Sequence, residues 1–222
     1  MPIDELAIYS ITTAIFLVSL TIHEYAHAWM AYRYGDDTAA RLGRLTLNPL
    51  AHISLLGTII LPLLVNFGWA KPVPVNASHF KNPHRDQILV SLAGPGANLL
   101  AATISFVLLA AMKLSMPLAN GVIVNMIVSG RIPKQNSIVV PLLGLLFFAF
   151  VINLALAIFN AIPIPPLDGH WILYELLPYN AGKALARMST YGFVLLYALM
   201  FLGAFRFIWW PIDQLLGLLL LV

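Results

Sequence analysis

A zinc-site motif, His23-Glu24-Tyr25-Ala26-His27, lies inside an apolar run (residues 6–32) that is long enough to span a membrane. Two histidines four residues apart lie on one helix face and can share a metal ion, and Glu24 is placed to activate a water molecule there. Each ionised group in hydrocarbon costs about 2.5–3.5 kcal/mol, so such a cluster predicts a function. The alternative is a chance HExxH match in a core helix, which that cost disfavours.

The composition indicates a membrane protein with several spans. Of the 222 residues, 60% are hydrophobic and 9% are charged, and the mean hydropathy is +0.87, so polar side chains are too few to cover a soluble globule. Cysteine is absent, which leaves nitrogen and oxygen ligands for any zinc. A net charge of +3 is ordinary for basic loops at an anionic membrane surface and does not indicate a nucleic-acid partner.

The apolar runs predict an all-α multispan bundle of about four to six transmembrane segments. We expect spans over residues 6–32, 88–112, 137–159 and 189–205, an outer loop over 113–136, and an apolar tail of undecided structure. The N-terminus lacks the basic region of a signal peptide, so the first span is expected to be retained. One membrane-embedded domain over residues 1–222 is the economical interpretation.

Residues 45–66 are apolar but are interrupted by Gly57, Pro62 and Asn66, which makes the segment too short to span comfortably. Its β-branched residues and its proline predict a re-entrant hairpin or loop near the active site. We expect this hairpin to offer a strand edge to an unwound substrate.

Basic residues set the expected orientation. Arg33, Arg41 and Arg44 follow the first span directly, which marks that end as cytoplasmic. At about 1.5 Å of rise per residue, His27 lies roughly 8 Å inside Tyr32. The active site is therefore expected near the cytoplasmic surface.

A catalytic zinc ion usually has three protein ligands and a water molecule, so the two histidines need a third ligand. Asp168 is the best candidate, because it follows the third span at its cytoplasmic end and no other carboxylate lies in so apolar a context. Three prolines exclude a helix over residues 160–169 and predict a stiff, extended loop that carries it. Alternatively, Asp168 starts a turn or caps a helix that begins at His170. His52 and His170 also remain possible ligands.

Other polar residues near the predicted spans are candidates for contact with substrate. Asn153 and Asn160 lie seven residues apart and share one helix face. Asn160 is the nearest of them in sequence to the candidate ligand Asp168, and its amide could stabilise the oxyanion that forms during hydrolysis. The carboxylates of Glu175 and Asp86 are expected to be more exposed to water.

These features resemble the site-2 protease family, the intramembrane zinc metalloproteases of peptidase family M50, in its minimal prokaryotic type without PDZ or CBS domains. The resemblance covers essentially the whole chain. It rests on the HExxH motif, on Gly94 and Asn98 in the second span, and on Asn160, Pro163, Pro165 and Leu167-Asp168-Gly169 after the third.

The resemblance implies one Zn2+ per chain held by His23, His27 and Asp168, with Glu24 as the general base. Asn160 and Asn98 become candidates for binding substrate or the oxyanion, and His52, in a segment that also resembles family sequences, is a possible auxiliary residue. The implied activity is hydrolysis of peptide bonds within or near transmembrane segments of substrates in the lipid bilayer of a prokaryotic plasma membrane. The oligomeric state is not specified.

A membrane transporter or metal carrier is the rival interpretation, since intramembrane His, Asp and Asn also mark ion pathways. Transport by ligand exchange does not need a non-ligating carboxylate at Glu24, whereas hydrolysis requires a base there. A scaffold without activity is disfavoured because all the chemical groups are present.

Overall fold

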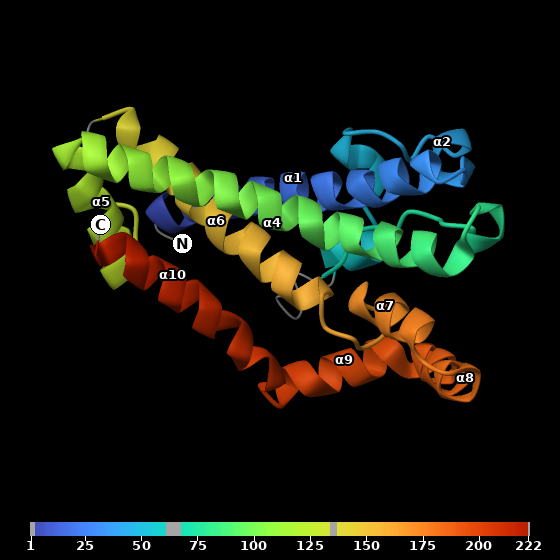
Figure 1. The fold of residues 1–222 in the computed structure, drawn as a ribbon. Helices are drawn as coiled ribbons and strands as arrows, with labels where there is room; N and C mark the ends of the chain where they lie inside the picture. Colours follow the sequence, from blue (N-terminus) through green and yellow to red (C-terminus); the bar gives the residue numbers. More distant parts are fainter. Residues whose placement is uncertain (1–2, 61–67, 134–136, 222) are drawn as a thin grey trace.

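The computed structural model describes residues 3–60, 68–133 and 137–221, and these residues form helices and turns with no β-strand among them (Figure 1). Helix α1 (Ile3–Arg33) has 31 residues, a length of about 46 Å. Within the described residues, four stretches meet the length and apolarity needed to cross a membrane: α4 (Pro83–Ser115), α6 (Val139–Asn160), Tyr179–Phe201 and Ala204–Leu221. The predicted all-α multispan bundle is confirmed.

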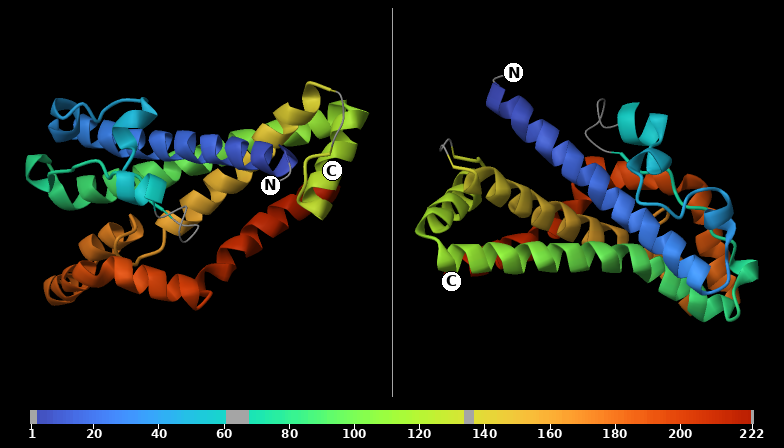
Figure 2. Two further views of the ribbon diagram at one scale, coloured as in Figure 1. Left: turned by 180° about the vertical axis from the view of Figure 1, so that it is seen from behind. Right: turned by 90° about the horizontal axis from the view of Figure 1, so that it is seen from above.

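Helix α4 packs against both α1 and α6, which also contact each other (Figures 1 and 2). One face of α4 carries small or short side chains, which lets the neighbouring helices approach closely. The buried members of this face are Ser91, Gly94, Asn98 and Ala102, spaced by three or four residues. Towards its C-terminal half, α4 shares an apolar core with buried residues of α6 such as Phe147 and Phe150.

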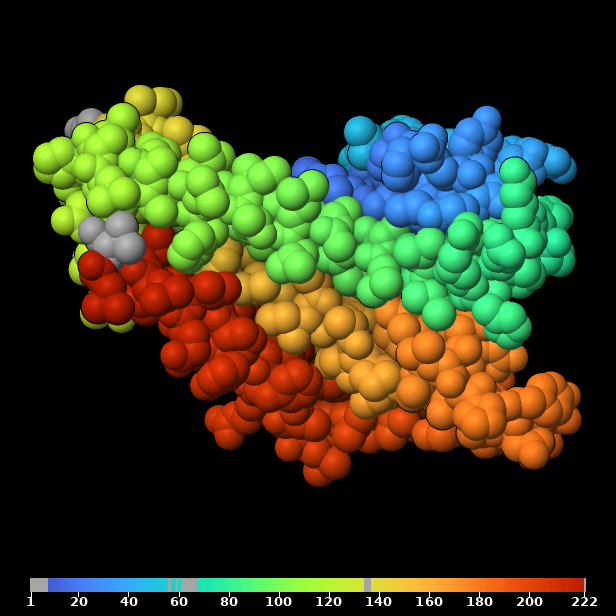
Figure 3. Space-filling model, viewed as in Figure 1, coloured from blue at the N-terminus to red at the C-terminus, as the bar shows by residue number. Residues whose placement is uncertain are grey.

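The C-terminal part of the chain returns along the bundle. It comprises α7 (Gly169–Leu176), α8 (Tyr179–Met188), α9 (Gly192–Phe201) and α10 (Trp209–Leu221). Helix α10 places Ile212 and Leu219 in the core shared by α4 and α6. The buried Lys113 of α4 donates to the carbonyl groups of Leu219 and Leu220, which supplies a cation at the C-terminal end of α10. Figure 3 shows this orange and red segment lying along one edge of the molecule.

The loop predicted over residues 113–136 contains a helix instead, α5 (Pro117–Ser129). Pro117 starts the helix at a position that needs no backbone donor, and Gly130 ends it in the left-handed conformation with φ 66°. Buried side chains spaced at three and four residues, including Val122 and Met126, join the core. The prediction missed this periodicity.

The strand edge predicted within residues 45–66 is wrong for the part of the segment that the structure describes. Residues Pro49–His52 form a short helical turn, η1, and Leu55–Ile60 form a turn of π-helix, η2. Local bonds such as Thr58 N–H to the carbonyl of Ser54 satisfy the backbone within the segment, so its donors do not line up as a strand edge. Residues 61–67, including Pro62 and Asn66, lie outside the described residues.

Candidate active site

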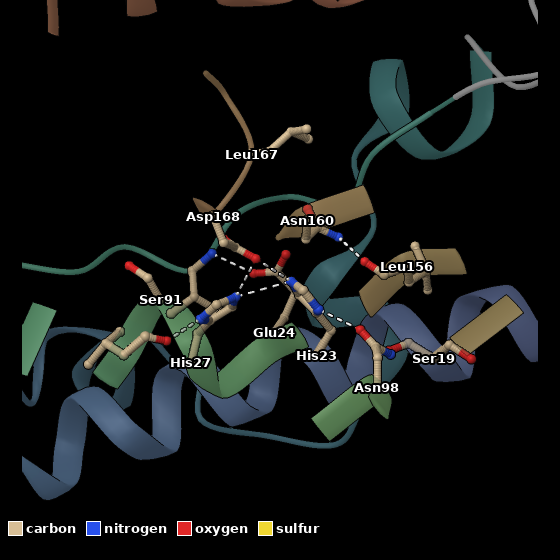
Figure 4. A network of polar contacts seen from close by, with 12 residues as sticks. Ser19, His23, Glu24, His27, Ser91, Asn98, Leu156, Asn160, Leu167 and Asp168 are labelled. Atoms are coloured by element: carbon tan, nitrogen blue, oxygen red, sulfur yellow. Dashed lines mark hydrogen bonds and ion pairs between the residues drawn. The ribbon is translucent and has the colours of Figure 1, made fainter. Parts of the chain in front are cut away.

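Three predicted ligands meet where α1 faces the connection between α6 and α7 (Figure 4). Asp168 Oδ2 lies 3.0 Å from His23 Nε2 and 3.2 Å from His27 Nε2, and the two Nε2 atoms are 3.0 Å apart. Tetrahedral zinc with ligand distances of about 2.0–2.1 Å would place its ligand atoms roughly 3.3 Å from one another. The triangle of side-chain atoms has nearly that size.

Hydrogen bonds behind the two imidazole rings fix their orientation. The Nδ1 atom of His23 lies 2.6 Å from Asn98 Oδ1, and the Nδ1 atom of His27 lies 2.7 Å from the carbonyl oxygen of Val90. Both partners are acceptors, so each Nδ1 carries a proton, and in the neutral rings each Nε2 turns a lone pair toward Asp168. Two lone pairs and a carboxylate oxygen converge here and would repel one another. A cation among them removes that repulsion, and two neutral imidazoles with a carboxylate suit zinc.

Asp168 occupies the N-cap position of α7, but its side chain makes no capping hydrogen bond and turns to the histidines instead. The predicted extended loop before it is wrong: the residues form compact turns, with the N–H of Leu167 donating to the carbonyl of Ile164. A side chain at Gly169 would place its Cβ 2.3 Å from the carbonyl oxygen of Ala161. Glycine therefore permits the close turn that returns Asp168 to α1.

Glu24 stands beside this triangle without joining it. One of its oxygens, Oε2, accepts a hydrogen bond of 2.8 Å from the backbone N–H of Val73. Val73 lies in an irregular run between Trp69 and Asn76 that passes along the site. Glu24 is therefore held close to the three converging atoms but is not one of the candidate metal ligands.

Two cavities meet at Glu24 and Asp168, and both are also lined by Pro72 and Pro166. The first, the membrane-side cavity, has a volume of about 1090 Å³. Its walls are mostly apolar and include Phe16, Leu20, Leu156, Asn160 and Phe193. The second has a volume of about 640 Å³ and leads away between the start of α4 and α7. We call it the polar cavity because ionisable side chains line it: Glu24, His27, His84, Asp168 and Glu175.

Asn98 is fully buried behind His23. Its side-chain N–H2 donates to Asn153 Oδ1 over 2.8 Å and to the carbonyl oxygen of Ser19 over 3.3 Å, while Asn153 donates to Ser19 Oγ. The whole amide is therefore used inside the protein, and Asn98 lines neither of the two cavities. The contacts of Ser19 and Asn153 with Asn98 were not predicted, because a serine in an apolar run gives no distinctive signal.

Gly94 lies directly against the rings of His23 and His27. A Cβ atom at this position would come within 2.2 Å of His27 Nε2 and 2.7 Å of His23. Asn160 lines the membrane-side cavity, and its amide donates to the carbonyl oxygen of Leu156 in its own helix (Figure 4). The sequence analysis placed Asn160 near the site, whereas the contact of Gly94 with the two histidines was not predicted.

The remaining histidine candidates have other partners. His52 is buried, with Nε2 2.9 Å from the carbonyl oxygen of Thr46 and Nδ1 3.5 Å from the Arg44 guanidinium, so it fastens the loop after α2 (Thr38–Arg41). His170 Nδ1 lies 2.6 Å from the carbonyl oxygen of Leu167. Asp86, expected to be exposed to water, is instead fully buried at the start of α4.

The fold and this site have the features of a membrane-embedded metallohydrolase. Residues 11–203 match the family described as Peptidase family M50, and the chain belongs to that family. The chain is an intramembrane zinc metalloprotease of the site-2 protease type, and membrane-embedded proteins are its substrates. Zinc is its cofactor, and the rival transporter interpretation has no support.

Similar proteins carry consistent names. A Bacillus subtilis protein named "Putative zinc metalloprotease YwhC" is 40% identical over 195 residues, which cover 88% of this chain and 82% of the relative. A Mycolicibacterium smegmatis protein named "Putative zinc metalloprotease Rip2" is 29% identical over 96% of this chain and 76% of its own length. The Mycobacterium tuberculosis protein of the same name is 31% identical over 89% of this chain and 69% of its own length. No solved structure gives a significant match.

Proposed function

We propose that His23, His27 and Asp168 hold the zinc ion and that Glu24 is the general base for hydrolysis of peptide bonds within or next to transmembrane segments. One observation supports this assignment best: His23 Nε2, His27 Nε2 and Asp168 Oδ2 converge on one point, and the carboxylate of Glu24 lies beside them without joining them. We assign the activity to a single membrane-embedded domain formed by residues 1–222.

When bound, zinc supplies Lewis-acid chemistry, polarising the scissile carbonyl and making water more acidic. Glu24 takes the proton of the attacking water and then returns it to the leaving amine nitrogen. The Val73 N–H holds Oε2 of Glu24 in place, which leaves Oε1 to carry the proton. Asn160, once its amide leaves the carbonyl of Leu156, donates to the oxygen on which negative charge develops.

The two cavities give the substrate its path. Apolar residues of a transmembrane segment enter the membrane-side cavity, whose walls match them, and the scissile bond lies at Glu24 and Asp168, where the cavities meet. The polar cavity admits water and receives the part of the substrate beyond that bond. The side chain of Asn98 is assigned to orienting His23 and not to the oxyanion.

The C-terminal end of α1 and the segment around Lys183 are assigned to the cytoplasmic side of a prokaryotic cell membrane, which the basic residues after α1 support. The absence of cysteine makes this testable. Single cysteines at Thr38 and Ala184 should react with an impermeant maleimide only from the cytoplasmic side. Labelling of either from outside would overturn the orientation.

The activity itself is tested with purified protein in detergent and a panel of single-span peptides. We expect cleavage inside or next to the apolar segment of some peptides, loss of cleavage after zinc chelation, and recovery when zinc is returned. Reconstituted vesicles that move zinc across the bilayer while no peptide is cleaved would instead favour a metal carrier.

A further inference from the structure

The polar cavity has a distinct far end. Near the site it is lined by Glu24, His27 and Asp168, and its far end is formed by His84 of α4 together with Trp171, Tyr174 and Glu175 of α7. None of the residues lining this cavity in the described part of the chain is a lysine or an arginine. An aromatic wall next to a carboxylate is suited to a basic side chain.

Helix α7 connects the two ends of the cavity. Asp168, Trp171 and Glu175 are spaced by three and four residues and therefore share one helix face. Seven residues of helix separate Asp168 from Glu175, a distance of about 10 Å along the axis. An extended peptide advances about 3.3 Å per residue, so Glu175 lies roughly three residues from a bond cleaved at Asp168.

The surroundings of Glu175 differ from those expected of a surface carboxylate. Its side chain is only 10% exposed, whereas its ion-pair partner His84 is 87% exposed. The His84 ring can therefore turn away into solvent, while Glu175 stays in the cavity. A lysine or arginine of a bound peptide can then take the place of His84 beside Glu175, and the aliphatic part of that side chain can pack along Trp171 and Tyr174.

We propose that Glu175 is a specificity-determining residue that binds a substrate lysine or arginine about three residues from the scissile bond. The proposal rests on the proposed function and narrows its substrate class to transmembrane segments with a basic residue at the membrane boundary. Basic residues are enriched there on the cytoplasmic side, which is where this cavity is assigned.

The experiment uses the full-length protein with zinc and a single-span peptide that it cleaves. One lysine is moved through the five positions on each side of the cleaved bond, with glutamine and glutamate at the same positions as controls, and kcat/KM is measured. We expect lysine at the third or fourth position on one side to exceed glutamine by about fivefold to tenfold, and glutamate to fall below it. The difference should shrink as the salt concentration rises.

Variants then assign the preference to one carboxylate. Glu175→Gln should bring the lysine-to-glutamine ratio close to one, and Glu175→Lys should favour glutamate. Asp213→Asn, which removes an exposed carboxylate of α10 that lines neither cavity, should leave the ratio unchanged. Zinc content and melting temperature are measured for each variant to separate specificity from unfolding.

Wild-type protein without a charge preference at any position would overturn the proposal, as would an unchanged preference in Glu175→Gln. Either result implies that Glu175 only docks α7 against α4. Failure of the proposed function is visible separately, because then the glutamine peptide would not be cleaved in a zinc-dependent way by the wild-type protein.

Discussion

Two clusters in this protein are built from the same two residue types, histidine and aspartate, and differ in what they can bind. His23, His27 and Asp168 form one, and Asp36, Asp37 and His79 form the other, at the turn after α1. In each cluster the three candidate ligand atoms lie within 4.8 Å of one another. Residue type and distance alone would therefore mark both as metal sites.

The hydrogen-bond donors around each cluster make the difference. Asp36 is fully buried, and its two oxygens accept from the backbone N–H groups of Thr38 and Asn76, at 3.1 and 2.7 Å, and from the ring of His79. Asp37 is paired with Arg41. In this cluster hydrogen-bond donors point at Asp36 from both sides, whereas at the first cluster the donors lie behind the rings and the lone pairs point inward. The second cluster therefore has a structural role: through Asp36 it connects the C-terminal end of α1 to the irregular segment that contains Asn76.

The largest expected contrast is between the two buried carboxylates. Asp168→Ala should lose most of its zinc and its proteolytic activity, because one of three protein ligands is removed. Asp36→Ala should keep the metal stoichiometry of the wild type. Metal analysis of the purified proteins checks both. A zinc-replete, active Asp168→Ala protein would break the comparison and point to His52 or His170 as the ligand.

Gly94→Ala tests whether close packing maintains the triangle. Its Cβ would overlap His27 Nε2, so we expect zinc binding and cleavage to fall by at least about tenfold. Gly96→Ala is the matched control, since a Cβ there meets no atom within 4 Å. Equal effects of the two substitutions would show that helix propensity, and not contact with the ligands, is responsible.

Substitutions of two asparagines distinguish two roles: orienting the His23 ring, proposed for Asn98, and stabilising the oxyanion, proposed for Asn160. Asn98→Ala should weaken zinc affinity by about 10- to 100-fold, because His23 loses the acceptor that fixes its ring. Asn160→Ala should retain zinc affinity and lower kcat by about 10²-fold. Zinc titration and cleavage kinetics on both variants decide the matter, and a normal zinc affinity in Asn98→Ala would refute the orienting role.

The smallest expected effect belongs to the second cluster. Burial opposes ionisation of Asp36, but hydrogen bonds from Thr38, Asn76 and His79 outweigh it and lower the pKa of this carboxyl. Asp36→Asn should therefore cost about 1–3 kcal/mol of stability near neutral pH. Because the pKa of Asp36 is lower in the folded state, its ionisation stabilises the protein at pH values above the unfolded-state pKa of about 3.9, and this stabilisation is lost as the pH falls through the folded-state pKa. The melting temperatures of the wild type and of Asp36→Asn should therefore converge as the pH is lowered.

Much of this architecture could be predicted because its signals are local. The spans follow from apolar length, and the spacing from His23 to His27 fixes a helix face. Asp168 could be selected because a carboxylate in so apolar a context is costly without a partner. These inferences need only the chain near each residue.

The remainder depends on contacts between distant segments. The hydrogen bonds of Asn98 with His23, Asn153 and Ser19 join three helices, and no pattern near Asn98 in the sequence predicts them. Glu175 looked like a surface carboxylate because the packing of α7 against α4, which buries it, is not encoded in nearby residues. Likewise, the β-branched residues near Thr58 suggested a strand, but local hydrogen bonds formed a helical turn.

Glu24→Gln tests the central assignment most directly, because glutamine keeps the size of the side chain and its ability to accept from Val73 N–H but cannot serve as a base. Zinc content and peptide cleavage are measured on the same purified sample. We predict one zinc ion per chain, as in the wild type, with cleavage reduced by at least about 10³-fold. A variant that has lost its zinc, or that cleaves at a near-normal rate, would contradict the assignment of His23, His27 and Asp168 as ligands and Glu24 as base.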